Sequence, residues 1–169
     1  MRTNNNHHSY FMKLFFSLVS MLLCIGTLHA QNAQRATAER LIEAIRNTPE
    51  EDFPILYPML KITQVIPQEQ GGMERLRQVF IFIKSQIQDQ GPILYTSKEA
   101  KELINSGQTN QQVSEILTSD KGTVFYLYLP YHDKFLVRSP IVVNSKNEII
   151  AINIDYCKDN TISLCLQYL

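Results

Sequence analysis

Few side chains of the types that perform catalysis occur after residue 30, and they are scattered along the chain. His132 is the single histidine there, so any nucleophile–histidine–acid arrangement has to use it. Asp133 follows directly, within Pro130–Asp133, a segment that predicts a β-turn. Because adjacent side chains on a turn rarely face each other, we expect a surface turn and no catalytic residues; a weak hydrolase using His132 is the alternative. We also expect no cofactor and no metal site, since one histidine and two cysteines leave at most three residues for a Cys/His zinc site.

Two cysteines near the C-terminus, Cys157 and Cys165, are a candidate disulfide. A closely spaced pair in an oxidising compartment predicts a bond, which would contribute about 2–3 kcal/mol by closing a short loop. The alternative is that both are small buried apolar residues on neighbouring strands. Their spacing is not that of a C-x-x-C redox motif.

Tyrosines gather around one predicted strand and the turn that follows it. Tyrosine combines apolar area with a polar tip, and it is enriched at contact surfaces. We therefore predict a binding site formed by Tyr126, Tyr128, Tyr131 and His132. The alternative is that the tyrosines cover the open face of a sheet or fill its margins.

Residues 1–30 have the pattern of a secretory signal peptide. Arg2 and Lys13 make a weakly basic start, an apolar run extends from Leu14 to Leu28, and Ala30 offers a small residue for cleavage. The run of roughly 15 residues is shorter than the roughly 20 apolar residues that a bilayer-spanning helix needs. The sequence therefore predicts cleavage after Ala30 and a secreted or periplasmic product with no stable membrane span.

Several alternatives for the leader stay open. Met12 is followed at once by a basic residue and the apolar run, so we hypothesise that translation starts there rather than at Met1. Ala33 is a second candidate for the residue before the cut. The leader could also be an uncleaved anchor, or Cys24 could be lipidated, although the bulky Leu23 before it departs from the lipobox pattern.

The remaining chain, residues 31–169, has the size of a single domain. Without Arg2 and Lys13 it carries 14 basic and 16 acidic side chains, a net charge of −2. The sequence has no cluster of lysine and arginine of the kind that binds nucleic acid, and it has no basic amphipathic stretch that would predict a membrane-surface helix. The expected partner is another protein, with an apolar small molecule as the alternative.

Hydrophobic periodicity predicts helices mainly in the first two thirds of this domain and strands in the last third. Helices are expected at Ala36–Asn47, from Thr48-Pro49 onward, at Met73–Gln88, and after the capping-box pairs Thr96/Glu99 and Thr109/Gln112. Strands are expected at Ile93–Tyr95, Thr123–Leu129, Lys134–Val143, Glu148–Tyr156 and Thr161–Leu169, with a hairpin turn at Asn144–Asn147. Pro140 should place its strand at an edge or a bulge, and Ile150 and Ile152 should both point inward.

This order predicts an α+β fold in which N-terminal helices pack on a C-terminal antiparallel sheet of about four strands. Over Ala36–Tyr156 the order of elements resembles cystatin-like and NTF2-like domains. The resemblance implies a curved sheet with a pocket between sheet and helices, and it implies no activity, because such folds host many functions. We hypothesise an exported non-enzymatic binding protein, such as an inhibitor or immunity protein for an exported hydrolase. The alternative is a periplasmic small-ligand-binding pocket domain, NTF2-like or sensor-like.

Overall fold

The computed structural model describes residues 17, 30–61, 72–87, 91–109, 116 and 118–152. The chain divides into two compact units, Met1–Ala33 and Gln34–Leu169. In the first unit, the described residues 17 and 30–33 are helical. Within the described ranges, no helix combines the length and the apolar character needed to cross a membrane.

Several sequence predictions lie outside the described residues. They concern the apolar leader with its alternative start at Met12, the cysteines Cys157 and Cys165, the helix after Thr109, and the strand Thr161–Leu169. They stay predictions.

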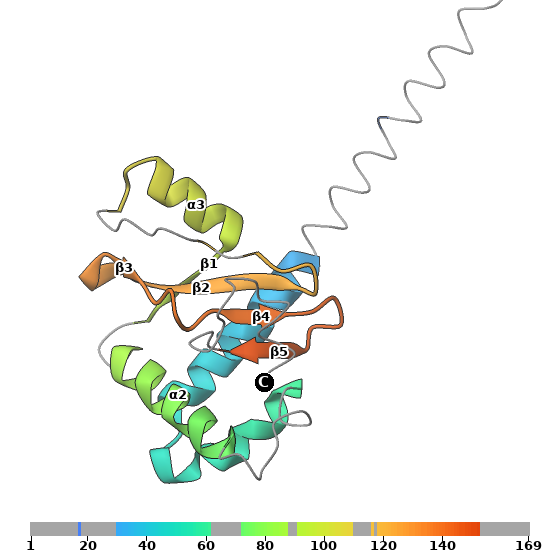
Figure 1. The fold of residues 1–169 in the computed structure, drawn as a ribbon, viewed down its shortest axis with the longest axis vertical. Helices are drawn as coiled ribbons and strands as arrows, with labels where there is room; N and C mark the ends of the chain where they lie inside the picture. The colour runs from blue at the N-terminus through green and yellow to red at the C-terminus, as the bar shows by residue number, and fades with distance from the viewer. Residues whose placement is uncertain are drawn as a thin grey trace, which may run out of the picture. The chain divides into compact units, whose positions relative to one another are not determined.

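The second unit places its helices mostly before its strands. Its described elements are a helix over residues 34–47, η1 (Glu50–Met59), α2 (Gly72–Ile87), β1 (Ile93–Thr96), α3 (Ser97–Asn105), β2 (Thr123–Leu129), η4 (Pro130–His132), β3 (Lys134–Phe135), β4 (Ile141–Val143) and β5 (Ile149–Ile152). The strands form one sheet in the order β1-β2-β4-β5, with β3 paired to β2 beside that path, and every pair is antiparallel. The predicted α+β class is therefore confirmed (Figure 1).

Helices cover both faces of this sheet. On one face, the 34–47 helix, η1 and α2 pack their apolar side chains against Phe125, Leu127 and Leu129 of β2. On the other face, Ala100 of α3 packs with Val124 and Tyr126 of the same strand. Figure 1 shows α3 on one side of the sheet and α2 on the other. Because each face of β2 is covered, its side chains alternate between two cores rather than between a core and water.

The helices predicted at Ala36–Asn47 and Met73–Gln88 agree with the structure in the face that they bury. Ala38, Leu41, Ile42 and Ile45 are all buried, as the periodicity requires. The helix predicted at Met73–Gln88 is α2, which the structure describes over Gly72–Ile87. The piece after Thr48 is a 3₁₀ helix whose N-cap is Pro49, without a side-chain capping bond. Thr48 was expected to cap it and does not; prolines inside this helix remove backbone donors, which keeps it irregular.

Two strand predictions need correction. The strand expected over Lys134–Val143 is divided into β3 and β4, and Pro140 lies just before β4. Ile150 and Ile152 do not share one face, because Ile152 belongs to the core under the 34–47 helix and Ile150 packs against the core under α3. The β4–β5 register shifts between Val142 and Val143, and such a bulge breaks strict alternation.

Candidate interaction surface

Three aromatic rings form a cluster at the β3 end of the sheet, on the face that also carries α3. Tyr128 of β2 is the register partner of Ile93 on β1 and of Phe135 on β3. The ring centroids of Tyr128 and Phe135 are 4.9 Å apart, and Tyr95 lies 5.8 Å from each of them. The three rings meet in edge-on or tilted geometry, which is favourable for aromatic pairs. Tyr95, Tyr128 and Phe135 are called the aromatic cluster below.

The hydroxyl of Tyr128 connects this cluster to the turn that follows β2. It donates to Oδ1 of Asp133 over 2.7 Å. Asp133 has a φ of 45°, in the left-handed region, and its backbone N–H donates to Pro130 O over 3.2 Å. Thr109 Oγ1 donates to the Asp133 carbonyl over 3.4 Å. Together these bonds hold the Pro130–Asp133 turn in one conformation.

The same contact changes the titration of Tyr128. Its hydrogen bond to the Asp133 carboxylate, together with partial burial, raises the pKa of the tyrosine hydroxyl above its ordinary value of 10.0. A donor to a carboxylate has to keep its proton, so the hydroxyl stays protonated at any physiological pH. One carboxylate oxygen of Asp133 thereby accepts a hydrogen bond within the structure of the turn.

The four residues predicted as a binding site do not form one exposed patch. Tyr126 is 0% exposed and belongs to the core under α3. Tyr128 is half-buried in the aromatic cluster. Tyr131 is 87% exposed, and His132 beside it in η4 is also exposed. Of these four residues, Tyr126 therefore lies in the core, Tyr128 links the aromatic cluster to the turn, and Tyr131 and His132 lie on the surface.

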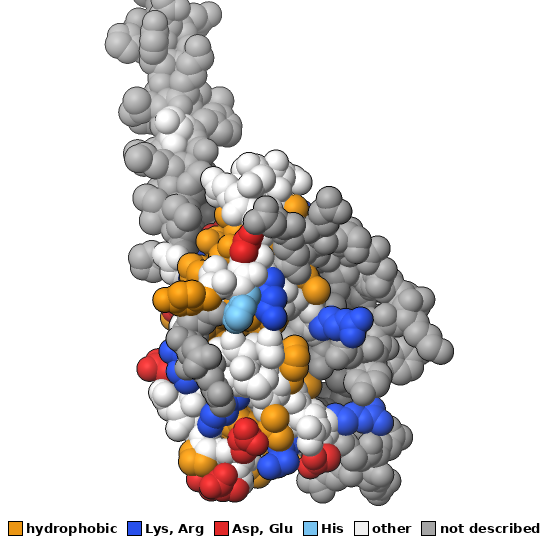
Figure 2. Space-filling model, turned by 90° about the vertical axis from the view of Figure 1, so that its left-hand side faces the viewer, with side chains coloured by type: hydrophobic (Ala, Val, Ile, Leu, Met, Phe, Trp, Pro, Cys, Tyr) orange, Lys and Arg blue, Asp and Glu red, His pale blue; other side chains and the backbone are white. Residues whose placement is uncertain are grey.

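Figure 2 shows the side of the molecule that lies at the left in Figure 1, where β3 is found. On its coloured part, hydrophobic side chains are scattered among basic, acidic and uncharged ones. Isolated apolar side chains are common on soluble domains, and they do not by themselves mark an interface. Tyr131 stands out because a large aromatic side chain sits almost wholly in water on a turn that is held in place.

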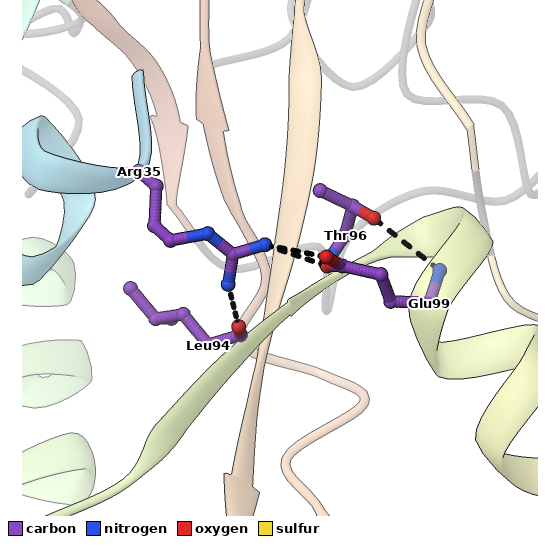
Figure 3. A network of polar contacts seen from close by, with 4 residues as sticks. All are labelled: Arg35, Leu94, Thr96 and Glu99. Atoms are coloured by element: carbon purple, nitrogen blue, oxygen red, sulfur yellow. Dashed lines mark hydrogen bonds and ion pairs between the residues drawn. The ribbon is translucent and has the colours of Figure 1, made fainter. Parts of the chain in front are cut away.

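An ion pair and a hydrogen bond from one arginine join the 34–47 helix to α3 and to β1. Arg35 on the 34–47 helix directs Nη2 to both carboxylate oxygens of Glu99, at 2.8 and 2.7 Å, and Nη1 to the carbonyl of Leu94 (Figure 3). Its guanidinium carbon also lies 5.6 Å from the centroid of the Phe125 ring. One cation therefore fastens the 34–47 helix to β1, to α3 and to β2.

Glu99 belongs to the capping box of α3, as the sequence predicts. Thr96 Oγ1 accepts from the Glu99 N–H, and the Glu99 carboxylate accepts from the Thr96 N–H over 2.6 Å. Burial opposes ionisation of Glu99, but the bonds from Thr96 and Arg35 outweigh it, so the pKa of this carboxyl is lowered. Sequence reasoning missed the contact between Arg35 and Glu99, because the two residues lie 64 positions apart in the chain.

Sequence reasoning also missed Tyr95 and Phe135 of the aromatic cluster. Each lies in a short strand whose neighbours become known only from the strand pairing. Asp133 was noticed only as a neighbour of His132, whereas its αL backbone and its bond to Tyr128 depend on the folded turn.

The described residues contain no group of three or more His, Cys, Asp and Glu side chains placed to hold a metal ion. Comparison of the chain with protein-family models, with curated proteins and with solved structures finds no match.

Proposed function

We propose that this chain is an exported, non-enzymatic domain that binds another protein through the Pro130–His132 turn. The observation that carries the proposal is the exposure of Tyr131. Its side chain is 87% exposed, although it lies in the turn just after β2, whose aromatic residues are buried or half-buried. Exposing such an apolar ring to water is unfavourable, and covering it with a partner recovers that free energy.

The turn is well suited to present an anchor residue. Tyrosine loses little conformational freedom when it is covered, and it is among the residue types that dominate binding energies. The Tyr128–Asp133 bond and the 3₁₀ turn hold the backbone around Tyr131 before any partner arrives. A preorganised contact residue lowers the entropic cost of association.

The proposed partner is an exported hydrolase, with this domain as its inhibitor or immunity protein. Support comes from the export pattern of residues 1–30 and from the scarcity of reactive side chains in residues 31–169. A domain of this kind needs a contact surface and no catalytic machinery.

Affinity measurements on matched surface variants test the proposal. The full chain is produced in an exporting host, and proteins retained by the exported form are identified and titrated individually. Tyr131→Ser should weaken binding of the true partner by about 30-fold, the loss expected for an anchor residue worth about 2 kcal/mol. Ile55→Ser is the control, because Ile55 is 68% exposed on η1 and lies outside the turn.

The two variants divide the outcomes. Loss of affinity in Tyr131→Ser with retention in Ile55→Ser supports the turn as the binding surface. If Tyr131→Ser bound the partner as tightly as Ile55→Ser does, the turn would not be the binding surface. Retention of the chain in the cytoplasm would contradict the export part of the proposal.

A further inference from the structure

We propose that the mature chain begins at Gln31 and that this residue cyclises to pyroglutamate. The inference rests on the proposed export, because it requires removal of the leader. Both candidate cuts leave an N-terminal glutamine, since Ala30 precedes Gln31 and Ala33 precedes Gln34. The structure distinguishes between these two glutamines.

Cyclisation of an N-terminal glutamine needs no partner molecule. The α-amino nitrogen attacks the side-chain carboxamide carbon, a carbon–nitrogen bond forms to close a five-membered lactam, and the side-chain nitrogen leaves as ammonia. The product has neither a free amine nor a side-chain amide nitrogen. A glutamine whose amide nitrogen is used by the fold therefore cannot undergo this reaction without disturbing the fold.

Gln34 is such a residue. Its side chain is buried, with Nε2 donating to the carbonyls of Asn144 at 2.9 Å and Val143 at 3.3 Å. Its Oε1 accepts from Thr123 Oγ1 over 2.7 Å. Cyclisation at Gln34 would remove the nitrogen that holds the end of β4. A cut after Ala33 would thus make Gln34 the terminal residue and open it to cyclisation, although its side-chain amide is hydrogen-bonded within the fold.

Gln31 differs from Gln34 in its exposure. It belongs to the other compact unit and is partly exposed. A chain that starts at Gln31 would also start a helix with a positive α-ammonium group, which the helix dipole disfavours. Lactam formation removes that charge. The cut after Ala30 therefore makes the partly exposed Gln31 the terminal residue and leaves the side-chain amide of Gln34 intact.

Mass spectrometry of the exported protein tests this inference. The full chain is expressed with its own leader, purified from the extracytoplasmic fraction without heating or acid, and measured intact, and its N-terminal peptide is then sequenced. We expect a mass that begins at residue 31 and lacks one ammonia, together with complete resistance to N-terminal Edman degradation. Gln31→Ser should be cut at the same place and give a readable terminus. Gln34→Leu should remain blocked.

Each other result identifies which step is wrong. A mature chain that begins at an unmodified Gln31 overturns the cyclisation and leaves export standing. A chain that begins at residue 34 overturns the choice of terminus. An uncut precursor contradicts the proposed export itself, and the inference falls with it.

Discussion

Replacing Gln34 by leucine should destabilise the domain by about 2–3 kcal/mol. The substitution keeps the side-chain volume but removes three hydrogen bonds, two donated by Nε2 and one accepted by Oε1. Each such bond contributes about 1 kcal/mol net, and the 3.3 Å bond to Val143 counts for less. The hydroxyl of Thr123 and the carbonyl of Asn144 then lose their buried partner, which adds a desolvation cost. The loss therefore falls well above the effect of a surface substitution.

Urea denaturation followed by circular dichroism measures this loss as a lower midpoint with an unchanged slope. Gln78→Leu is the matched control, because Gln78 is exposed on α2 and its side-chain amide donates to Glu74 of the same helix. The control should change the free energy of unfolding by less than about 0.5 kcal/mol. If Gln34→Leu were no more destabilising than Gln78→Leu, the view of Gln34 as a structural anchor would be refuted.

Three further predictions concern other contacts of the same unit. Glu99→Gln should lower the free energy of unfolding by about 1 kcal/mol at neutral pH, a modest figure because the carboxylate is partly exposed and water screens it. Because the pKa of Glu99 is lowered in the folded state, the carboxylate stabilises the fold above its ordinary pKa of 4.5, and this stabilisation is lost as the pH falls through the folded pKa. The melting temperatures of the two proteins should therefore converge in acid. Gly122→Ala should cost about 2 kcal/mol in a thermal melt, because its new Cβ would lie 2.4 Å from the carbonyl oxygen of Val143. Tyr128→Phe should cost about 1 kcal/mol and speed amide hydrogen exchange in the Pro130–Asp133 turn, because the bond to Asp133 is lost.

Controls make these results specific. Gly91→Ala should be far milder than Gly122→Ala, because among the residues that the structure describes a Cβ at Gly91 meets the Arg46 side chain, at ordinary contact distance. A constant difference between Glu99→Gln and the parent protein from neutral to acid pH would contradict the assigned ionisation. Unchanged exchange at Tyr131 in Tyr128→Phe would show that the hydroxyl bond does not hold the turn.

Local patterns were sufficient to predict most of the elements. The 34–47 helix buries the face that its periodicity marks, because the interval of three to four residues reports directly on which side of a helix is apolar. The capping box at Thr96 and Glu99 forms as expected, because its partners are only three residues apart. Strand β2 presents apolar residues on both faces, and the structure places a core against each.

The sequence does not show which residues of the candidate site are exposed, because exposure depends on the surroundings of a residue rather than on its type. Tyr126 and Tyr131 are the same amino acid in adjoining elements, yet one is 0% and the other 87% exposed. The cover that buries Tyr126 comes from α3 and from neighbouring strands. No periodicity within β2 contains that information.

The sequence alone thus determined the α+β class, the apolar faces of the main helices and the start of α3, since these depend on residues within a few positions of one another. Tertiary structure decided which tyrosines are exposed, how the β4–β5 register shifts, and that Arg35 and Gln34 fasten the first helix to the sheet. The three hydrogen-bond partners of Gln34 lie 89, 109 and 110 residues away in sequence. Polar contacts at such separations arise from packing, because the folded chain alone brings the two groups within bonding distance.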